Sequence, residues 1–403
     1  MKLDSKKIFI LGLGFFGINL LWPVYNAFVP IMLEQYTTKA TLIGLIMTID
    51  NLFAVIFQPI FGAMSDRTRS RFGRRMPYIL IGLPISAILF SIVPYTSSLK
   101  SLMLTVIIMN FTMSIYRAPT VALMPDVTPS PLRSKANGIV NFMGGLAAVI
   151  AYLIGGVLYK KNPTYPFHLS SIVMIIALII LYIFIKEPID FIIEKKVKRE
   201  RNTDIGKTRS LIFLLLAIFF WFTGYNAVET FFSLYGQHVL NIDPSKASIL
   251  LSLFSASFLV FAIPSGYLGT KIGRRKTILI GLIGVILVFA PLIFIKNVAL
   301  ITILLVVGGG FWAMININSY PMIVEIAPKN GVGAYTGYYY FFSASSAVAS
   351  PILFGRIKDL LGSYDILFLY SVISFIIALS CMNFVKHGDV ELDEEKRLAI
   401  EMN

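Results

Sequence analysis

Charged residues are scarce in this chain of 403 residues: Asp, Glu, Lys and Arg make up 14% of it, and hydrophobic residues 57%. In an ordinary soluble domain about 25% of the residues are charged, so this composition cannot cover a water-exposed surface. Apolar runs of roughly 20 residues recur along the chain, and each is long enough to cross about 30 Å of hydrocarbon as a helix. The composition therefore predicts an all-α membrane protein and excludes a soluble globular domain.

The chain also lacks the residue patterns that disulfide, metal and nucleotide chemistry require. It has one cysteine, Cys381, so an intrachain disulfide is impossible, and its three histidines, His168, His238 and His387, are scattered. We find no helical metal-binding pair, nucleophile elbow or Gly-rich phosphate loop. We therefore expect no enzyme activity, no metal, no cofactor and no ATP-driven pump. The net charge of +14 comes from Lys and Arg between apolar runs, which argues against a nucleic-acid partner.

Twelve apolar runs predict twelve transmembrane helices, with both termini on one side of the membrane. The predicted spans are residues 8–30, 41–63, 77–97, 100–122, 137–158, 168–187, 210–235, 247–268, 277–296, 298–322, 334–355 and 364–385. The side that holds the termini carries 26 of the 35 Lys and Arg residues, and the loops of the other side carry 8. Because basic residues accumulate in the cytoplasm, we expect a multi-pass cell-membrane protein with cytoplasmic N- and C-termini.

An internal repeat with an offset near 200 residues divides the chain into two halves. Its three anchors are Tyr25–Ala27 with Tyr225–Ala227, Gly73–Arg75 with Gly273–Arg275, and Asp126–Pro129 with Glu325–Pro328. The repeat predicts two pseudo-symmetric six-helix bundles, at residues 1–187 and 210–386. A cytoplasmic linker at 188–209 and a cytoplasmic tail at 387–403 complete the chain. Two like halves favour a carrier whose site lies between them near the bilayer midplane and opens by rocking.

The loop Gly62–Arg75, which reads GAMSDRTRSRFGRR, resembles the signature between helices 2 and 3 of the major facilitator superfamily. A degenerate copy, Gly266–Lys276, stands where that family places its second signature, so the resemblance covers nearly the whole chain. It implies the major facilitator fold and a conformational latch in these charged loops; the alternative is a purely topological cluster of basic residues. The implied latch residues are Gly62, Asp66, Arg67, Gly73, Arg74, Arg75, Gly273, Arg274 and Arg275.

A narrower resemblance concerns the substrate. Gln58-Pro59 and the segment Ser65–Pro77 are similar to the sucrose and maltose proton symporters, and Thr68–Arg71 also resembles the glycoside-pentoside-hexuronide cation symporters. The resemblance implies a glycoside substrate. The chain departs from the plant sucrose carriers in helix 4, where Asn110 and Val121 stand at the places of their Asp and Arg. It also lacks the sodium-binding acids of the melibiose carriers, so the coupling site must lie elsewhere.

Three charged residues lie inside predicted spans: Asp50 in the second, Arg117 in the fourth and Glu229 in the seventh. A charge at the centre of a membrane helix costs at least about 2.5 kcal/mol, so such residues rarely face lipid. We interpret all three as proton-coupling residues, with Asp50 as the proton carrier and Glu229 as its rival. The alternatives are a permanent structural pair of Asp50 with Arg117, and sugar binding by Glu229.

Amide and aromatic side chains on predicted helices 1, 4, 7 and 10 are candidates to bind the substrate, because a sugar needs polar groups for its hydroxyls and aromatic faces for its C–H surface. The candidates are Asn19, Trp22, Tyr25, Asn26, Asn110, Tyr225, Asn226, Trp312, Asn316 and Tyr320. The alternative is that the Asn residues join helices and the aromatic rings face lipid.

The sequence thus favours a secondary active transporter that imports a small sugar or glycoside, such as the disaccharides sucrose or maltose, together with a proton. Its expected partners are the sugar, the proton and membrane lipid, and we expect a monomer. The alternative is a proton-coupled antiporter that exports drugs or metabolites. Such antiporters usually carry Gly-Pro-x-x-Gly-Gly in helix 5, whereas the segment 141–152 of this chain has no proline.

Overall fold

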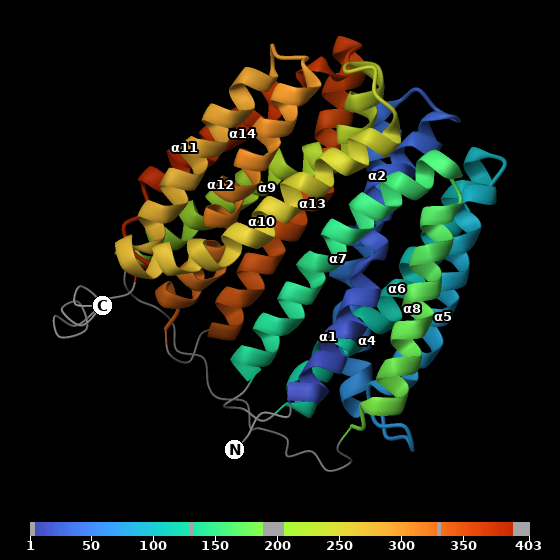
Figure 1. Ribbon diagram of the computed structural model, residues 1–403. Coiled ribbons are helices and arrows are strands. Elements are labelled where there is room, and N and C mark those ends of the chain that lie inside the picture. Colours follow the sequence, from blue (N-terminus) through green and yellow to red (C-terminus); the bar gives the residue numbers. More distant parts are fainter. Residues whose placement is uncertain (1–4, 129–132, 188–204, 329–331, 390–403) are drawn as a thin grey trace. The chain divides into compact units, whose positions relative to one another are not determined.

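The computed structural model describes residues 5–128, 133–187, 205–328 and 332–389, and the regular structure of these residues is entirely helical (Figure 1). The first six predicted spans are α1 (Ser5–Asn19) with α2 (Leu21–Glu34), α3 (Ala40–Met47) with α4 (Ile49–Arg67), α5 (Met76–Ile92) with the 3-10 turn η1 (Val93–Tyr95), α6 (Leu99–Val127), α7 (Arg133–Lys161) and α8 (Tyr165–Phe184). The last six are α9 (Ile205–His238), α10 (Pro244–Ile272), α11 (Arg274–Leu292), α12 (Val298–Ile326), α13 (Val332–Leu361) and η3 (Tyr364–Ile366) with α14 (Leu367–Asn383). The prediction of an all-α membrane protein is confirmed.

Eleven helices within the described residues are long and apolar enough to cross a membrane. The predicted span 334–355 is the exception. It lies within α13, which is helical over 30 residues, but its many Tyr, Ser and Gly residues lower its hydropathy. Its length alone is sufficient for α13 to span a membrane.

Two predicted spans contain a break that the sequence pattern does not reveal. The first span breaks at Leu20 between α1 and α2, because Pro23 has no N–H to donate to the carbonyl of Asn19. The second breaks at Thr48 between α3 and α4, where the Thr48 hydroxyl donates to the carbonyl of Leu45. Each break therefore lies beside a polar residue that the sequence singles out, Asn19 and Asp50.

The chain forms two compact units that are not consecutive in sequence. Unit 1 comprises Met1–Ile193, Glu229–Ser255 and Pro351–Tyr364, and unit 2 comprises Glu194–Val228, Ala256–Ser350 and Asp365–Asn403. Three helices, α9, α10 and α13, therefore contribute one end to each unit. The predicted linker 188–209 and tail 387–403 fall largely outside the described residues, so the predicted division into two bundles stays a prediction.

Small residues bring the helices of each unit into close contact. In unit 1, α1 packs on α7 and α8, and α5 packs on α6 and α8. A methyl group at Gly17 would collide with the Cβ of Ala177 on α8. In unit 2, α11 packs on α12 and α14, and a Cβ at Gly284 would lie 2.5 Å from Cε1 of Phe311. Such approaches are how membrane helices gain van der Waals packing where apolar burial supplies little driving force.

Candidate functional site

Two of the three intramembrane charges, Asp50 and Arg117, lie near the break in the second span. Asp50 lies in the first turn of α4, a favourable place for a carboxylate, and its Oδ1 accepts a hydrogen bond of 2.9 Å from Asn51 Nδ2. Arg117 of α6 is close enough to interact electrostatically with Asp50, but the two form no direct ion pair. Instead the Arg117 guanidinium stacks over the indole of Trp22, 4.9 Å from the ring centroid. The structure therefore brings together residues that the sequence assigned to coupling and to substrate binding.

Two buried polar side chains lie next to this cluster. Tyr25 of α2 and Asn110 of α6 face each other and are almost completely buried. Among the residues that the structure describes, neither the Tyr25 hydroxyl nor the Asn110 amide has a hydrogen-bond partner of ordinary geometry. A buried polar group without a partner costs roughly 1–3 kcal/mol. Tyr25 is enclosed by protein, so a substrate can reach it only if the surrounding helices move.

The first predicted span, which comprises α1 and α2, has one more partly exposed face. Asn19, Trp22 and Asn26 are half-buried while most of their neighbours are buried, as their spacing of three and four residues requires. Asn19 donates a 2.8 Å hydrogen bond to the carbonyl of Phe15 in its own helix. The amide nitrogen of Asn19 is therefore already engaged within its own helix and is less available to a ligand.

Glu229 belongs to a different cluster of unit 1, around the hydroxyl of Tyr152 in α7. That hydroxyl lies beside the Asn26 side chain and within electrostatic range of the Glu229 carboxylate. Ser248 of α10 donates a 2.7 Å hydrogen bond to the carbonyl of Tyr152. The sequence analysis did not single out Tyr152, although it is the one aromatic residue between Phe142 and Tyr159.

In unit 2 the predicted aromatic residues form a stack. The rings of Tyr225 and Trp312 are parallel, with centroids 4.5 Å apart and an interplanar angle of 2°, and Phe222 packs edge-on against Trp312. Asn226 Nδ2 donates a 3.3 Å hydrogen bond to the Ser346 hydroxyl. This part of the predicted set is brought together.

The remaining two predicted residues of unit 2 do not join the stack. Asn316 is half-buried on α12, and its carbonyl accepts a hydrogen bond from Ser319. Tyr320 lies in the last two turns of α12, where its hydroxyl is 3.2 Å from the Thr336 hydroxyl and its ring packs on that of Tyr339. Tyr320 thus takes part in a local tyrosine cluster.

The predicted latch of unit 1 is an ion-pair network centred on Asp126. Arg74 Nη2 lies 2.5 Å from Asp126 Oδ1, and Arg75 Nε lies 2.9 Å from Oδ2. Arg75 also pairs with Asp66 and donates 3.3 Å to the carbonyl of Gly62. The network ties the end of the second span to the end of α6. The predicted residue Arg67 is exposed and lies outside this network.

Glu187, which the sequence analysis missed, completes this cluster. Its carboxylate accepts the backbone N–H groups of Arg74 at 2.8 Å, Arg75 at 3.0 Å and Met76 at 2.7 Å, at the N-terminus of α5. A carboxylate there satisfies unpaired amides and complements the helix dipole. Gly73 lies against it with a φ of 100°, a conformation that few residues other than glycine adopt.

Unit 2 repeats the arrangement with fewer bonds. Arg274 Nη1 lies 2.9 Å from Glu325 Oε1, and Asp389 accepts the backbone N–H of Arg275 at 2.9 Å. Gly273 has a φ of 96°. Glu187 and Asp389 follow the last helix of each half at nearly the repeat offset, and this spacing is the signal that could have identified both.

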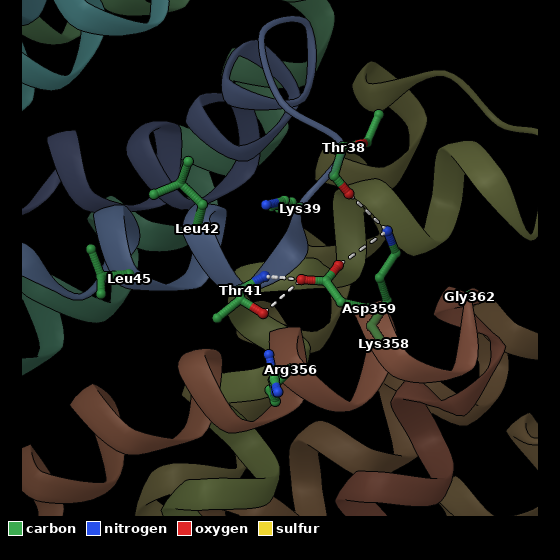
Figure 2. A pocket seen from close by; sticks show the side chains of 9 residues that line it. All are labelled: Thr38, Lys39, Thr41, Leu42, Leu45, Arg356, Lys358, Asp359 and Gly362. Carbon is green, nitrogen blue, oxygen red and sulfur yellow. Dashed lines mark hydrogen bonds and ion pairs between the residues drawn. The ribbon is translucent and has the colours of Figure 1, made fainter.

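A second set of contacts in unit 1 lies at the opposite end of the spans and joins the start of α3 to the end of α13; we call it the seam. Asp359 Oδ1 accepts the N–H of Ala40 at 2.8 Å. Its Oδ2 accepts the Thr41 hydroxyl at 2.6 Å (Figure 2). Lys358 Nζ donates 3.1 Å to the carbonyl of Thr38. The seam links segments more than 300 residues apart in sequence.

The seam continues at Glu34, the last residue of α2. One Glu34 oxygen lies 2.7 Å from His238 Nε2, and the other accepts the Tyr364 hydroxyl at 3.1 Å. The His238 and Tyr364 rings stack. Glu34 therefore binds the ends of two predicted second-half helices to the first helix of the chain.

Several known transporters are similar to this chain. It is 26% identical over 377 residues to the tetracycline resistance protein, class B, of Escherichia coli, which covers 85% of each chain. It is 25% identical to the quinolone resistance protein NorA of Staphylococcus aureus, over 64% of this chain and 66% of that protein. It is 30% identical to the human proton-associated sugar transporter A, over 39% of this chain but only 23% of that protein.

Solved structures agree with the fold. The nucleoside transporter NupG superposes with a TM-score of 0.73 at 15% identity, covering 94% of this chain and all of the other. A bacterial homologue of the human lysosomal transporter Spinster gives 0.71 at 13% identity, covering 96% and 95%. The family model of the Major Facilitator Superfamily matches residues 9–351 and 237–397. With its apolar helices and this match over most of its length, the chain is a multi-pass membrane protein and a secondary transporter that belongs to the Major Facilitator Superfamily.

Proposed function

We propose that this protein carries a small sugar or glycoside, such as a disaccharide, across the membrane together with a proton, by alternating access. The observation that carries the proposal is the stack of Arg117 on Trp22 beside Asp50. An aromatic face, a guanidinium and an amide within one cluster match the C–H surface and the hydroxyls of a sugar. The similarity to the proton-associated sugar transporter A supports this substrate class.

Coupling follows from the position of Arg117 between two partners. In the structure its guanidinium rests on Trp22, and Asp50 forms no direct ion pair within the described ranges of the chain. A sugar that packs against Trp22 and Arg117 holds the guanidinium on the indole, so Asp50 keeps its proton while the sugar is bound. When the sugar leaves, the guanidinium can move toward Asp50, where its positive charge favours release of the proton. Binding of the sugar and retention of the proton are thereby linked through one side chain. Glu229, beside Tyr152, is the rival proton carrier.

Alternating access requires contacts that break at each end of the spans in turn. We assign the Asp126 network and its repeat at Glu325 to the predicted cytoplasmic end, as a latch that holds the loop arrangement of each half. We assign the seam at Asp359 and Glu34 to the opposite end, where it must open for the substrate to enter from that side.

A second candidate is proton-coupled antiport of drugs or metabolites. It is favoured by the similarity to the class B tetracycline resistance protein, which extends over 85% of both chains. Within each unit, the polar and aromatic residues suit either class of substrate. The absence of the helix-5 proline element is the feature of the sequence that speaks against it.

Counterflow in proteoliposomes separates the two candidates. Vesicles loaded with unlabelled maltose or sucrose should accumulate the labelled sugar without a pH gradient, and an inward proton gradient should drive net uptake. About 100 mV supplies ~2.3 kcal/mol per proton, enough for roughly 50-fold accumulation of a neutral sugar. Absence of sugar counterflow, with tetracycline driving proton exchange instead, would establish the antiporter.

Two matched substitutions locate the proton. Asp50→Asn should abolish proton-driven uptake and leave sugar counterflow intact, whereas Glu229→Gln should keep both activities. Full driven uptake by Asp50→Asn, with its loss in Glu229→Gln, would move the coupling site to the Tyr152 cluster.

A further inference from the structure

A cavity of about 750 Å³ lies beside the seam in unit 1, where α3 begins and α13 ends (Figure 2). Its lining combines three basic side chains, Lys39, Arg356 and Lys358, with the acid Asp359. Because α3 and α4 form one span from Ala40 to Arg67, the cavity is at the opposite end of that span from the latch. It is therefore at the depth where a bilayer has its headgroups, and its lining shares no residue with the polar clusters of the proposed transport site.

The charges of this cavity do not cancel. Asp359 already accepts hydrogen bonds from Ala40 and Thr41 and lies 3.7 Å from Lys358, which itself donates to the carbonyl of Thr38. Those contacts neutralise the acid and occupy one of the bases. Lys39 and Arg356 are exposed and have no ion pair or hydrogen bond to any part of the chain that the structure describes, apart from backbone contacts. The cavity thus keeps two cations available for an anion.

Topology does not explain these basic residues. On the predicted non-cytoplasmic side the loops hold few Lys and Arg, as the positive-inside rule leads us to expect. Three of those few, Lys39, Arg356 and Lys358, converge on this one cavity from two segments more than 300 residues apart. Clusters of basic side chains at the membrane surface are typical of sites for anionic headgroups.

The cavity also has an apolar part, which extends along α3. Leu42 and Leu45 of α3 line it, and the Leu45 side chain is 47% exposed. Both lie within a span that is predicted to cross the hydrocarbon, so an acyl chain has a surface to follow below the basic residues. A free phosphate would use the cations and leave this surface without a role.

We propose that this cavity binds the phosphate of an anionic phospholipid, held between Lys39 and Arg356, with one acyl chain along Leu42 and Leu45. Lys39 precedes α3 and Arg356 belongs to the last two turns of α13, so a phosphate between them joins the same two segments as Asp359 does. The lipid thereby stabilises the closed seam. Binding itself does not depend on which substrate the protein carries.

The test uses the purified full-length protein in detergent, titrated with dioleoylphosphatidylglycerol and followed by native mass spectrometry and thermal unfolding. Lys39→Gln with Arg356→Gln should weaken lipid binding about 30-fold, since each basic side chain near an anionic surface contributes roughly fivefold. The matched control is Lys100→Gln with Lys246→Gln, which removes two exposed lysines of the same predicted side outside the cavity and should bind as the unmodified protein does. The charge-preserving pair Lys39→Arg with Arg356→Lys should retain binding and shows that a loss is not a folding defect.

Three results would overturn the proposal. One is equal binding of the lipid by the Gln pair and the unmodified protein. Another is equal stabilisation by dioleoylphosphatidylcholine, whose headgroup has no net charge. The third is protection by inorganic phosphate or glycerol 3-phosphate that matches the lipid at equal concentration, which would assign the site to a free anion. A rise in the thermal midpoint with phosphatidylglycerol alone, lost in the Gln pair, supports it.

Discussion

The seam leaves no room for a methyl group at Gly44. A Cβ there would lie 2.6 Å from the carbonyl carbon of Pro351 and 3.1 Å from the backbone nitrogen of Ile352, and still closer to the Pro351 oxygen. These are backbone atoms of α13, so no rotamer change relieves the clash. From the other side, a Cβ at Gly355 would lie 2.6 Å from the carbonyl carbon of Ala40. Two glycines, one on each helix, thus permit α3 and α13 to touch.

Gly44→Ala should therefore shift the protein toward the state in which the seam is open. The contact at 2.6 Å must widen to at least 3.4 Å, the onset of ordinary van der Waals contact, so the helices have to part by roughly 1 Å. Overpacking of this kind costs about 1–3 kcal/mol. If opening the seam relieves it, the open state gains roughly 5- to 150-fold in population.

Distances between spin labels at Lys39→Cys and Leu360→Cys measure this shift, in a Cys381→Ser background that removes the one native cysteine. Leu360 is 70% exposed, so a label there does not disturb packing. The distribution in Gly44→Ala should move to longer distances, and Gly337→Ala, where a Cβ meets nothing within 4 Å, should leave it unchanged. A distribution in Gly44→Ala that matches the unmodified protein, with normal transport, would refute the steric argument.

Three further outcomes follow from individual contacts. Glu187→Gln should lower the free energy of unfolding by about 2–3 kcal/mol in thermal unfolding, and Asp389→Asn by at most ~1 kcal/mol, because Glu187 accepts N–H groups from three residues and Asp389 from one. Gly269→Ala should destabilise unit 2 by roughly 1–3 kcal/mol in thermal unfolding, since its Cβ would lie 2.8 Å from Cγ of a buried Asn, whereas Gly266→Ala meets only an ordinary contact at 3.6 Å. Partial burial tends to raise the pKa of Asp359, which lies beyond the predicted span 334–355, but hydrogen bonds from Thr41 and Ala40 hold that pKa below its ordinary value. Its contribution to the seam is therefore complete above the ordinary pKa of about 3.9 and is lost as the pH falls through the lowered pKa, so the label distances should stay short at about pH 5 and lengthen only in stronger acid.

The helical spans were predictable because long apolar runs leave a chain in the bilayer few alternatives. The breaks were harder to predict. Pro23 marks the first, but the second, at Thr48, has no nearby proline, and depends on a hydroxyl bond to Leu45 that competes with regular helix geometry. Sequence placed Asp50 in the middle of a continuous helix, whereas the structure places it in the first turn of a new one.

The polar contacts were only partly predictable, for a different reason. The composition of the loop at Arg74 and Arg75 was enough to predict a charged cluster. Its main partners, Asp126 and Glu187, could not be predicted in this way, because they are 51 to 113 residues away. The structural ion pair of Asp50 with Arg117, one of the alternatives drawn from the sequence, assumed that two opposite charges within the membrane bind each other. A guanidinium can also rest on an aromatic face, and which partner it takes is decided by packing that no local pattern records.

The repeat separates what both halves share from what one half adds. Glycines with positive φ, arginines and a helix-ending acid recur at the loop of each half, so both loops are built to hold the same local geometry. At the repeat offset, Arg117 corresponds to Asn316, and Asp50 has no acidic counterpart. A motion that treats the halves alike needs only the shared parts, whereas a proton binds one carboxylate and cannot be divided between equivalent sites. Coupling therefore belongs where the symmetry is broken, and the proposal at Asp50 stands or falls with the transport phenotype of that single residue.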